Sequence, residues 1–221
     1  RAFWTHWFKN NRLDREFTIL DLGCGSGWLS RLFNDIPEAK IARLTGIDLK
    51  IQRPVEDLRF PVNVYVGDST TMSKPGDLSY NLVVSQSFLE HVEDYLEVID
   101  KFGSGGSIAQ IHLVPGVDSL YCYGPHGYRQ FNAFDLFAIK RALGDKYDIT
   151  VYKFCPYGSV IRHITDFSIP RVMGYFRRVF LKRKIPLRHP RYKSTSRHHA
   201  SKKVLLSDLF IAIQLTPKPV K

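Results

Sequence analysis

The segment Asp21–Gly27 reads Asp-Leu-Gly-Cys-Gly-Ser-Gly, so that an acid is followed by three glycines at alternate positions. These glycines, Gly23, Gly25 and Gly27, allow the backbone to turn tightly and to lie directly against a bulky ligand, because no Cβ intervenes. The apolar residues before the segment indicate a short strand. A helix that begins near Ser26 would point its free N–H groups at the same ligand. The pattern predicts a loop that binds a nucleotide-type cofactor.

The spacing of the glycines distinguishes between cofactors. A dinucleotide loop reads G-x-G-x-x-G, but Trp28 stands where the third glycine would fall. No Lys-Ser/Thr pair follows the glycines, so the sequence lacks the phosphate loop G-x-x-x-x-G-K-[ST]. Asp21 would repel a pyrophosphate and would suit a cofactor that carries an amine or another cation. The loop therefore favours a cationic cofactor over a dinucleotide.

Two further predicted strands end in polar residues that could contact a nucleotide. Asp48 ends the run Leu44–Asp48, and Asp68 and Ser69 follow the alternating run Val62–Val66. An acid at the end of a second strand can accept hydrogen bonds from both hydroxyl groups of a ribose. Ligands of doubly wound sheets bind outside the carboxyl ends of the strands. We therefore expect these residues to lie beside the glycine loop.

Two segments resemble a known family. Asp21–Gly27 closely resembles motif I of the class I S-adenosylmethionine-dependent methyltransferases, and Gln86–Val92 resembles the "LEHV" segment of their small-molecule (type 11/23-like) branch. The resemblance implies that the cofactor is S-adenosylmethionine and the product S-adenosylhomocysteine (SAH). It also implies that the glycine loop packs on the methionine part and that Asp68 contacts the adenine amino group. The residues expected to bind the cofactor are Asp21, Gly23, Gly25, Gly27, Asp48, Asp68, Ser69 and Ser85.

Candidate residues for the acceptor side follow the predicted fourth and fifth strands. Methyl transfer is an in-line displacement at a sulfonium, which requires alignment and, for a hydroxyl acceptor, a base; we expect no metal. His91 follows the fourth strand, and His126 lies in Tyr123–Phe131, which resembles the substrate-covering "H…h.r.F" segment of the family. We predict that His126 or His91 acts as base or orienter. Tyr128 and Arg129 are expected to orient the acceptor, and Arg129 would suit an anionic one.

The residues after the fourth strand disfavour two alternative reactions. Ser85–Phe88 reads Ser-Gln-Ser-Phe, whereas enzymes that methylate amino groups of nucleic acids carry Asn/Asp-Pro-Pro-Tyr/Phe there, and those that methylate pyrimidine carbon carry Pro-Cys. The segment favours transfer to oxygen, or to nitrogen of a small molecule, with a small-molecule, glycan or lipid-linked acceptor. A nucleic-acid methyltransferase and a non-catalytic binding module of this fold remain alternatives. His112, which is flanked by apolar residues, is interpreted as a core histidine.

The elements that must position these residues alternate between strands and helices. The alternation predicts an α/β fold over residues 1–221, a single domain with a doubly wound, Rossmann-like sheet and helices on both faces. The family implies seven strands, mostly parallel, with an antiparallel seventh. The strands are expected at residues 17–22, 43–48, 62–66, 80–85, 107–114, 147–154 and 209–215. Helices are expected at residues 89–102 and 133–143, and an amphipathic helix over Arg1–Lys9 is expected beside the cofactor site.

The basic residues of the chain are concentrated in one segment. The net charge is +11; residues 171–203 hold twelve of the 32 Lys and Arg and no acid, which leaves 20 basic against 21 acidic residues elsewhere. This segment belongs to residues 155–206, an expected basic, partly helical insertion between strands six and seven, with a helix over residues 169–180. We expect residues 169–203 to contact an anionic membrane surface. Nucleic acid is less favoured because aromatic residues are few, and a basic arm that docks a protein or an acidic polymer is the third interpretation.

The composition is that of a globular chain, with 44% apolar residues. No run of about eighteen apolar residues occurs, so no membrane-spanning helix is expected. The cysteines Cys24, Cys122 and Cys155 are scattered and odd in number, which favours neither a disulfide framework nor a zinc site. The expected location is the reducing cytoplasm, or, through the basic segment, the periphery of a membrane.

Overall fold

The computed structural model describes residues 1–11, 16–50, 57–71, 79–103, 107–117, 119, 127–154 and 210–219. Its strands are β1 (Phe17–Leu22), β2 (Ile41–Asp48), β3 (Val62–Val66), β4 (Leu82–Gln86), β5 (Ala109–Pro115), β6 (Tyr147–Phe154) and β7 (Phe210–Pro217). Its helices are α1 (Ala2–Asn10), α2 (Trp28–Asn34), α3 (Tyr95–Gly103) and α5 (Ala133–Leu143), and a 3-10 turn, η1, spans Leu89–His91.

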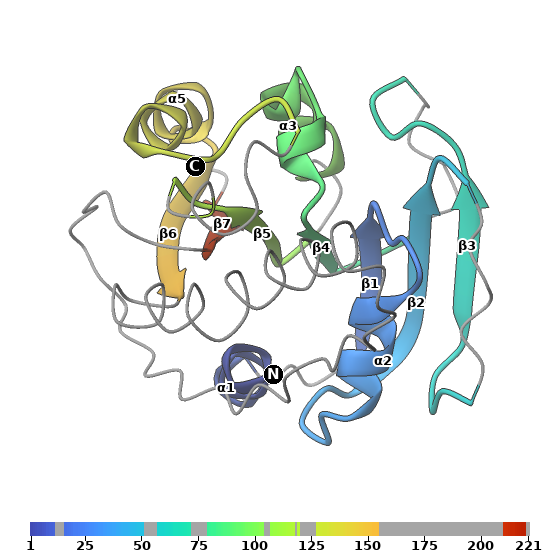
Figure 1. The fold of residues 1–221 in the computed structure, drawn as a ribbon. Coiled ribbons are helices and arrows are strands. Elements are labelled where there is room, and N and C mark those ends of the chain that lie inside the picture. The colour runs from blue at the N-terminus through green and yellow to red at the C-terminus, as the bar shows by residue number, and fades with distance from the viewer. Residues whose placement is uncertain are drawn as a thin grey trace, which may run out of the picture.

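The strands form one sheet in the order β3-β2-β1-β4-β5-β7-β6 (Figure 1). The first five strands pair in parallel, and β7 runs antiparallel between β5 and β6. The strand order reverses after β3, because β4 pairs with β1. Sheets of this kind bind ligands at such a reversal. The structure confirms the predicted doubly wound sheet with an antiparallel seventh strand.

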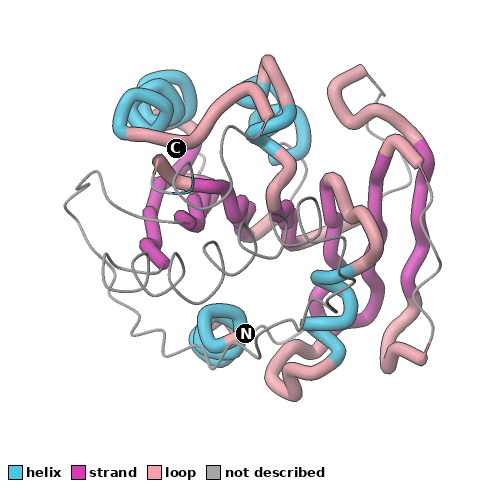
Figure 2. Tube along the Cα trace, in the orientation of Figure 1, coloured by secondary structure: helices cyan, strands magenta, loops and turns pink. Residues whose placement is uncertain are grey.

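Helices cover both faces of the sheet. In Figures 1 and 2, α1 and α2 lie on one face, and α3 and α5 lie on the other. Along β1, Ile19 belongs to the core under α1 and α2, whereas Leu20 and Leu22 belong to the core under α3 and α5. This is the two-residue alternation of a strand that is buried on both sides.

The N-terminal helix α1 forms as predicted, but it does not line the cavity described below. Its aromatic residues Phe3, Trp4, Trp7 and Phe8 are all buried, and Trp4 meets Phe33 of α2 edge to face at a centroid distance of 4.9 Å. No residue of α1 lines the cavity. Four aromatic rings on one helix face need a broad apolar surface, which the sheet and α2 provide. The expected position beside the cofactor site therefore stays a prediction, and within the described lining α1 makes no contribution to the cavity.

The helix predicted over residues 89–102 is divided in the structure. Leu89–His91 form only a 3-10 turn, Val92 is extended with φ −109° and ψ 123°, and α3 begins at Tyr95. A 3-10 turn followed by a helix can bury the same apolar stripe as one continuous helix, so the spacing did not reveal the break. The break directs residues 93–94 to the cavity.

The expected insertion, residues 155–206, lies outside the described residues, together with the expected helix over 169–180 and the segment 169–203. The strands on either side of it are described, and Phe154 of β6 pairs with Phe210 of β7. Among the helices of the described ranges, none is long and apolar enough to cross a membrane.

Candidate active site

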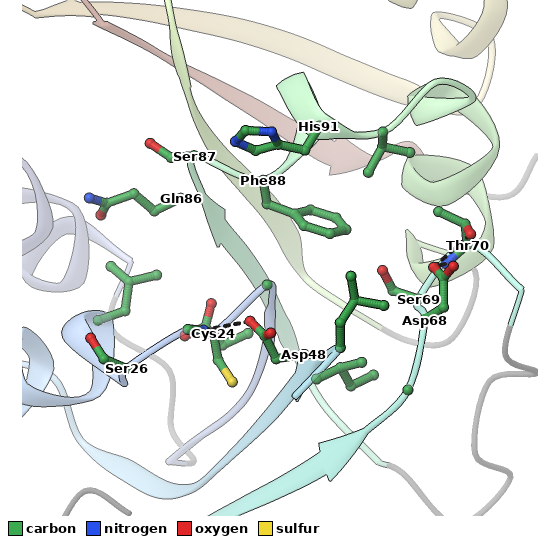
Figure 3. Close-up of a pocket in the computed structure, with 18 of the residues that line it drawn as sticks. Cys24, Ser26, Asp48, Asp68, Ser69, Thr70, Gln86, Ser87, Phe88 and His91 are labelled. Carbon is green, nitrogen blue, oxygen red and sulfur yellow. Dashed lines mark hydrogen bonds between the residues drawn. The ribbon is translucent and has the colours of Figure 1, made fainter. Parts of the chain in front are cut away.

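A cavity of about 740 Å³ opens at the carboxyl ends of β1, β2, β3 and β4 (Figure 3). Three parts of the chain supply most of its described lining: the glycine loop after β1, the residues after β2 and β3, and the turn after β4. Residues 127–131, which we call the strap, lie against that turn and contribute Tyr128 to the lining. The cavity therefore lies at the edge of the sheet where the glycine loop and the acids were expected to meet.

All three glycines of the loop adopt the left-handed backbone conformation, with φ values of 68°, 50° and 73° for Gly23, Gly25 and Gly27. A Cβ on Gly23 would lie 2.5 Å from the ring of Phe88. At Gly25, no described atom lies within 4 Å of the position that a Cβ would take. The amide of Gly25 donates to Oδ2 of Asp48 over 2.7 Å. The loop thus bends towards β2 and presents bare backbone at Gly25 to the cavity.

Asp21 lies beneath the loop and contributes to the cavity wall. It is only 1% exposed, and neither carboxyl oxygen has a hydrogen-bond partner in the described part of the chain. Burial raises the pKa of Asp21 well above its ordinary value, and the nearby charge of Asp48 raises it further. Buried polar groups in folded proteins are nearly always paired. An unpaired carboxyl at a cavity wall therefore fits a ligand that carries a donor such as an ammonium group.

Asp48 and Asp68 lie on the ends of neighbouring strands at the cavity (Figure 3). Asp48 uses Oδ2 for the glycine loop, while its Oδ1 accepts a long bond of 3.4 Å from the amide of Lys50. Oδ1 of Asp68 accepts from the hydroxyl of Thr70 over 2.6 Å and from its amide over 2.8 Å, and these bonds lower the pKa of Asp68. Ser69, which is buried, also lines the cavity.

The turn after β4 brings a histidine and a buried acid to another wall of the cavity. His91 lines the cavity, and its ring points towards Ser87 in the view of Figure 3. Ser87 has a left-handed backbone with φ 49°, which is uncommon outside glycine. Beside His91, Glu90 is fully buried, and its carboxyl oxygens have no hydrogen-bond partner within the described ranges. Burial raises the pKa of Glu90 to about 7.

The strap holds this turn in place. The amide of Tyr128 donates to the carbonyl of Glu90 over 2.6 Å. Gly127, with φ 70°, packs so closely that a Cβ on it would lie 2.4 Å from the same oxygen. At the other end of the strap, the amide of Phe131 donates to the carbonyl of Pro115 over 2.9 Å. The strap therefore connects the turn after β4 to the end of β5.

Arg129 fastens the strap rather than facing the cavity. Its guanidinium donates to the carbonyl of Glu93 over 2.8 Å and lies 4.4 Å from the centroid of the Tyr95 ring. It is not among the residues that line the cavity, whereas its neighbour Tyr128 is. The predicted role of Arg129 in orienting an anionic acceptor does not fit this placement, because a backbone carbonyl and an aromatic ring already engage the guanidinium.

Two residues predicted to bind the cofactor also lie away from the lining. Ser85 Oγ and His112 Nδ1 are 2.9 Å apart in the fully buried interior of the sheet. Because side chains alternate along a strand, Gln86 lines the cavity in place of Ser85. Gly27 precedes α2 as its N-terminal cap. Burial lowers the pKa of His112 to about 3, so this residue is a neutral core histidine, as interpreted from the sequence. His126 lies outside the described residues.

Some residues at the cavity were not foreseen from the sequence. Glu93 and Asp94 line it between η1 and α3, where the apolar stripe suggested continuous helix. Lys101 of α3 donates to the backbone carbonyls of Ser69 and Thr70 over 3.2 and 3.3 Å, so that α3 fastens the loop after β3. No local pattern signals such a contact, because it joins segments that are distant in sequence. Within the described ranges, no three His, Cys, Asp or Glu side chains are grouped as metal ligands.

The sequence matches a known family over more than half of its length. The profile of a family described as a methyltransferase domain matches residues 2–118 of the 221 residues, a range that includes the glycine loop, Asp48, Asp68 and His91. The protein belongs to this family and is a class I S-adenosylmethionine-dependent methyltransferase. The class and the cofactor predicted from motif I are thereby confirmed. No curated protein matches the chain.

Solved structures share the fold at low sequence identity. The methyltransferase domain of bacterial CtHen1-C is 15% identical, with a TM-score of 0.59 over 99% of this chain and 96% of that chain. The plantazolicin methyltransferase BpumL, solved with a triazolic desmethylPZN analogue and SAH, is 16% identical, with a TM-score of 0.56 over 98% and 82%. The [4+2]-cyclase SpnF is 16% identical, with a TM-score of 0.52 over 99% and 82%. These likenesses establish the fold alone, and the cyclase shows that the fold also occurs with other chemistry.

Proposed function

We propose that the protein transfers the methyl group of S-adenosylmethionine to an oxygen atom of a small-molecule acceptor that enters the cavity beside His91. The observation that carries the proposal is the buried, unpaired carboxyl of Asp21 at the cavity wall. Three acids, Asp21, Asp48 and Asp68, lie at the carboxyl ends of the adjacent strands β1, β2 and β3, and all three line the cavity. These are the positions that the family motifs assign to the cofactor.

The residues at this end of the cavity fit S-adenosylmethionine. Asp21 offers an acceptor to the ammonium group of the methionine part, and bare backbone at Gly25 allows close approach. Oδ1 of Asp48, which holds only a 3.4 Å bond from a backbone amide, can accept from a ribose hydroxyl. Asp68 and Ser69 are the candidates for the adenine contact. When bound, the cofactor supplies an electrophilic methyl group on a sulfonium, and these side chains hold it in place.

His91 is the proposed base on the acceptor side. An imidazole at the cavity wall can accept the proton of an acceptor hydroxyl as that oxygen bonds to the methyl carbon. The strap keeps the histidine in position, because Gly127 and Tyr128 pack on the backbone of the preceding residue, Glu90. Tyr128 is 69% exposed and forms part of the rim through which an acceptor would enter. His126 remains a predicted alternative base.

Glycan and lipid-linked acceptors are narrower forms of the same proposal. A role for residues 169–203 at an anionic membrane surface, or on nucleic acid, concerns a part of the chain outside the described residues. Flotation with liposomes that contain anionic lipid tests the membrane role. Salt-sensitive binding that is lost when residues 171–203 are deleted would support it, and binding to RNA without binding to liposomes at the same salt would contradict it.

Calorimetry with SAH tests the proposed function. The intact protein should bind SAH, and Asp48→Ala should raise the Kd about 10- to 100-fold, the usual range for a lost hydrogen bond to a charged group. Asp145→Ala, which removes an exposed acid away from the cavity, is the matched control and should leave the Kd unchanged. Unaltered SAH affinity in Asp48→Ala would show that Asp48 does not contact the ribose. Absence of SAH binding by the intact protein would overturn the proposed function.

A further inference from the structure

The cavity carries more acids than its cofactor can account for. Its lining includes five acidic residues within the described ranges and, in those ranges, neither Lys nor Arg. The acidic residues are Asp21, Asp48, Asp68, Glu93 and Asp94. Outside residues 171–203 the chain is close to neutral, with 20 basic and 21 acidic residues. The excess is therefore a property of the cavity rather than of the overall composition.

Only three of these acids belong to the cofactor end. Asp21, Asp48 and Asp68 lie at the ends of β1, β2 and β3, whereas Glu93 and Asp94 lie between η1 and α3. S-Adenosylmethionine carries a sulfonium, an ammonium and a carboxylate, so its net charge is only +1. One positive charge does not balance the four acids other than Asp21, and two of these four, Glu93 and Asp94, follow His91 closely in the chain.

Within the described ranges, three cations lie close to this cavity without lining it. Arg31 of α2 donates to the carbonyl of Ser26, which lines the cavity. Arg129 donates to the carbonyl of Glu93 and packs over Tyr95. Lys101 donates to the carbonyls of Ser69 and Thr70. None of these side chains lines the cavity. The three cations thus stabilise backbone at the rim, and of them Lys101 also acts on a lining acid, because its charge helps to lower the pKa of Asp68.

We propose, given the function proposed above, that the acceptor carries a positive charge, as an amine or guanidinium group, and that Glu93 and Asp94 recognise it. Carboxylates attract such a group and repel a phosphate or a carboxylate. The exposed ring of Tyr128 lines the same end of the cavity and offers a second surface to a cation. Asp21, which is buried and unpaired at the cofactor end, shows that another wall of the same cavity also suits a cationic group.

Recognition by these two carboxylates leaves the transfer step itself unchanged. The acceptor oxygen bonds to the methyl carbon, the carbon–sulfur bond breaks with its electron pair left on sulfur, and the hydroxyl proton passes to His91. The cationic group of the acceptor takes no part in this exchange. Glu93 and Asp94 are therefore specificity-determining residues, and their removal should act on the selection of the acceptor.

A methylation panel sorted by charge tests the proposal on full-length protein that has been shown to bind SAH. The cationic members of the panel are aminosugars and arginine peptides. Their neutral counterparts are N-acetylated sugars and citrulline peptides, and their anionic counterparts are phosphorylated. Radiolabelled S-adenosylmethionine is the methyl donor. We expect kcat/KM for the cationic members to exceed that for their neutral counterparts about tenfold, and KM to rise with salt, because salt screens the attraction. Preference for neutral or phosphorylated members, or transfer to none of them by protein that binds SAH, would overturn the proposal. Failure to bind SAH would instead overturn the proposed function.

The double variant Glu93→Gln/Asp94→Asn separates recognition from folding. The carbonyl of residue 93 that accepts from Arg129 belongs to the backbone, and the carbonyl of residue 94 that accepts from the amides of Glu97 and Val98 does so as well. We expect kcat/KM for cationic acceptors to fall about tenfold, the salt dependence of KM to flatten, and the Kd of SAH to stay within about twofold. Glu97→Gln, an exposed acid of α3 that does not line the cavity, is the control. Unaltered kcat/KM and salt dependence in the double variant would overturn the assignment.

Discussion

The backbone amide of Gly25 donates to Oδ2 of Asp48 over 2.7 Å, so the glycine loop after β1 and the end of β2 form one unit. The first turn of the loop is held by the same strand, because the amides of Gly23 and Cys24 donate to the carbonyl of Ile47 over 2.8 and 3.2 Å. Three backbone donors are thus fixed on one strand end without a ligand. Such preorganisation reduces the entropy that binding must remove.

Two glycines of this loop should respond differently to substitution by alanine. A Cβ on Gly25 would stand in open space at the cavity, so Gly25→Ala should weaken SAH binding at least tenfold while the φ of 50° lowers the free energy of unfolding by about 1–2 kcal/mol. Gly23→Ala should destabilise more, by about 2–4 kcal/mol, because its Cβ would lie 2.5 Å from Phe88. Urea unfolding and calorimetry measure both effects. Normal SAH affinity in Gly25→Ala would contradict the view that this glycine faces the cofactor.

Asp21→Asn should stabilise the protein and weaken its cofactor binding. The folded-state pKa of Asp21 is raised above the ordinary 3.8, so the unfolded chain ionises first and folding is disfavoured at neutral pH. Removing the charge should raise the free energy of unfolding at pH 7 by about 1–3 kcal/mol and should have little effect below about pH 3, where the carboxyl is largely protonated in the unfolded chain as well. The Kd of SAH should rise at least tenfold. Asp145→Asn, an exposed control, should change neither the free energy of unfolding nor the Kd of SAH. Full SAH affinity in Asp21→Asn would show that Asp21 does not bind the cofactor.

The grouping of residues at the end of the cavity proposed for the cofactor could be predicted, because these residues follow strands directly in the sequence. Glycine spacing and one acid after each of three strands define it locally. Ser85 shows where this approach fails: the strand was expected to end at residue 85, but β4 continues to Gln86. Since neighbouring side chains on a strand face opposite ways, one residue decides which of the two lines the cavity.

At the end proposed for the acceptor, His91 and Tyr128 were predicted and line the cavity, but the geometry around them could not be predicted, because it depends on contacts between distant segments. The amide of Tyr128 donates to the carbonyl of Glu90, and the guanidinium of Arg129 donates to that of Glu93. Neither hydrogen bond can be recognised from a local pattern in the sequence. The position of Arg129 beside the predicted active site suggested that it recognises an anion. The structure shows instead that its guanidinium binds a backbone carbonyl. The divided helix after β4 has the same origin, since a 3-10 turn and an α-helix bury similar stripes.

Lys101→Met should weaken ligand binding at the end of the cavity proposed for the adenosine part of the cofactor. Lys101 holds the loop after β3 through the carbonyls of Ser69 and Thr70, at 3.2 and 3.3 Å, and Met preserves most of its length without the donors. The Kd values of both SAH and adenosine should rise about 3- to 10-fold, the effect of one or two hydrogen bonds of ordinary strength. Calorimetry with the two ligands measures this. Lys140→Met, an exposed lysine of α5, is the control, and equal affinities in the two variants would show that α3 does not support the loop.

Glu90→Gln should remove part of the pH dependence of stability. Burial raises the pKa of Glu90 from the ordinary 4.5 to about 7. Below pH 4.5 the carboxyl is protonated in both states, and between pH 4.5 and 7 only the unfolded chain ionises, so the free energy of unfolding falls as the pH rises, by about 3 kcal/mol for a shift of this size. Gln stays neutral, so the variant should match the wild type at pH 4.5 and exceed it by about 1–3 kcal/mol at pH 8. Urea unfolding from pH 4 to 9 measures the difference, with Glu93→Gln as an exposed control. Asp21 leaves a residual slope of the same sign in both proteins. Parallel curves for the variant and the wild type would show that Glu90 ionises at its ordinary pKa in the folded protein.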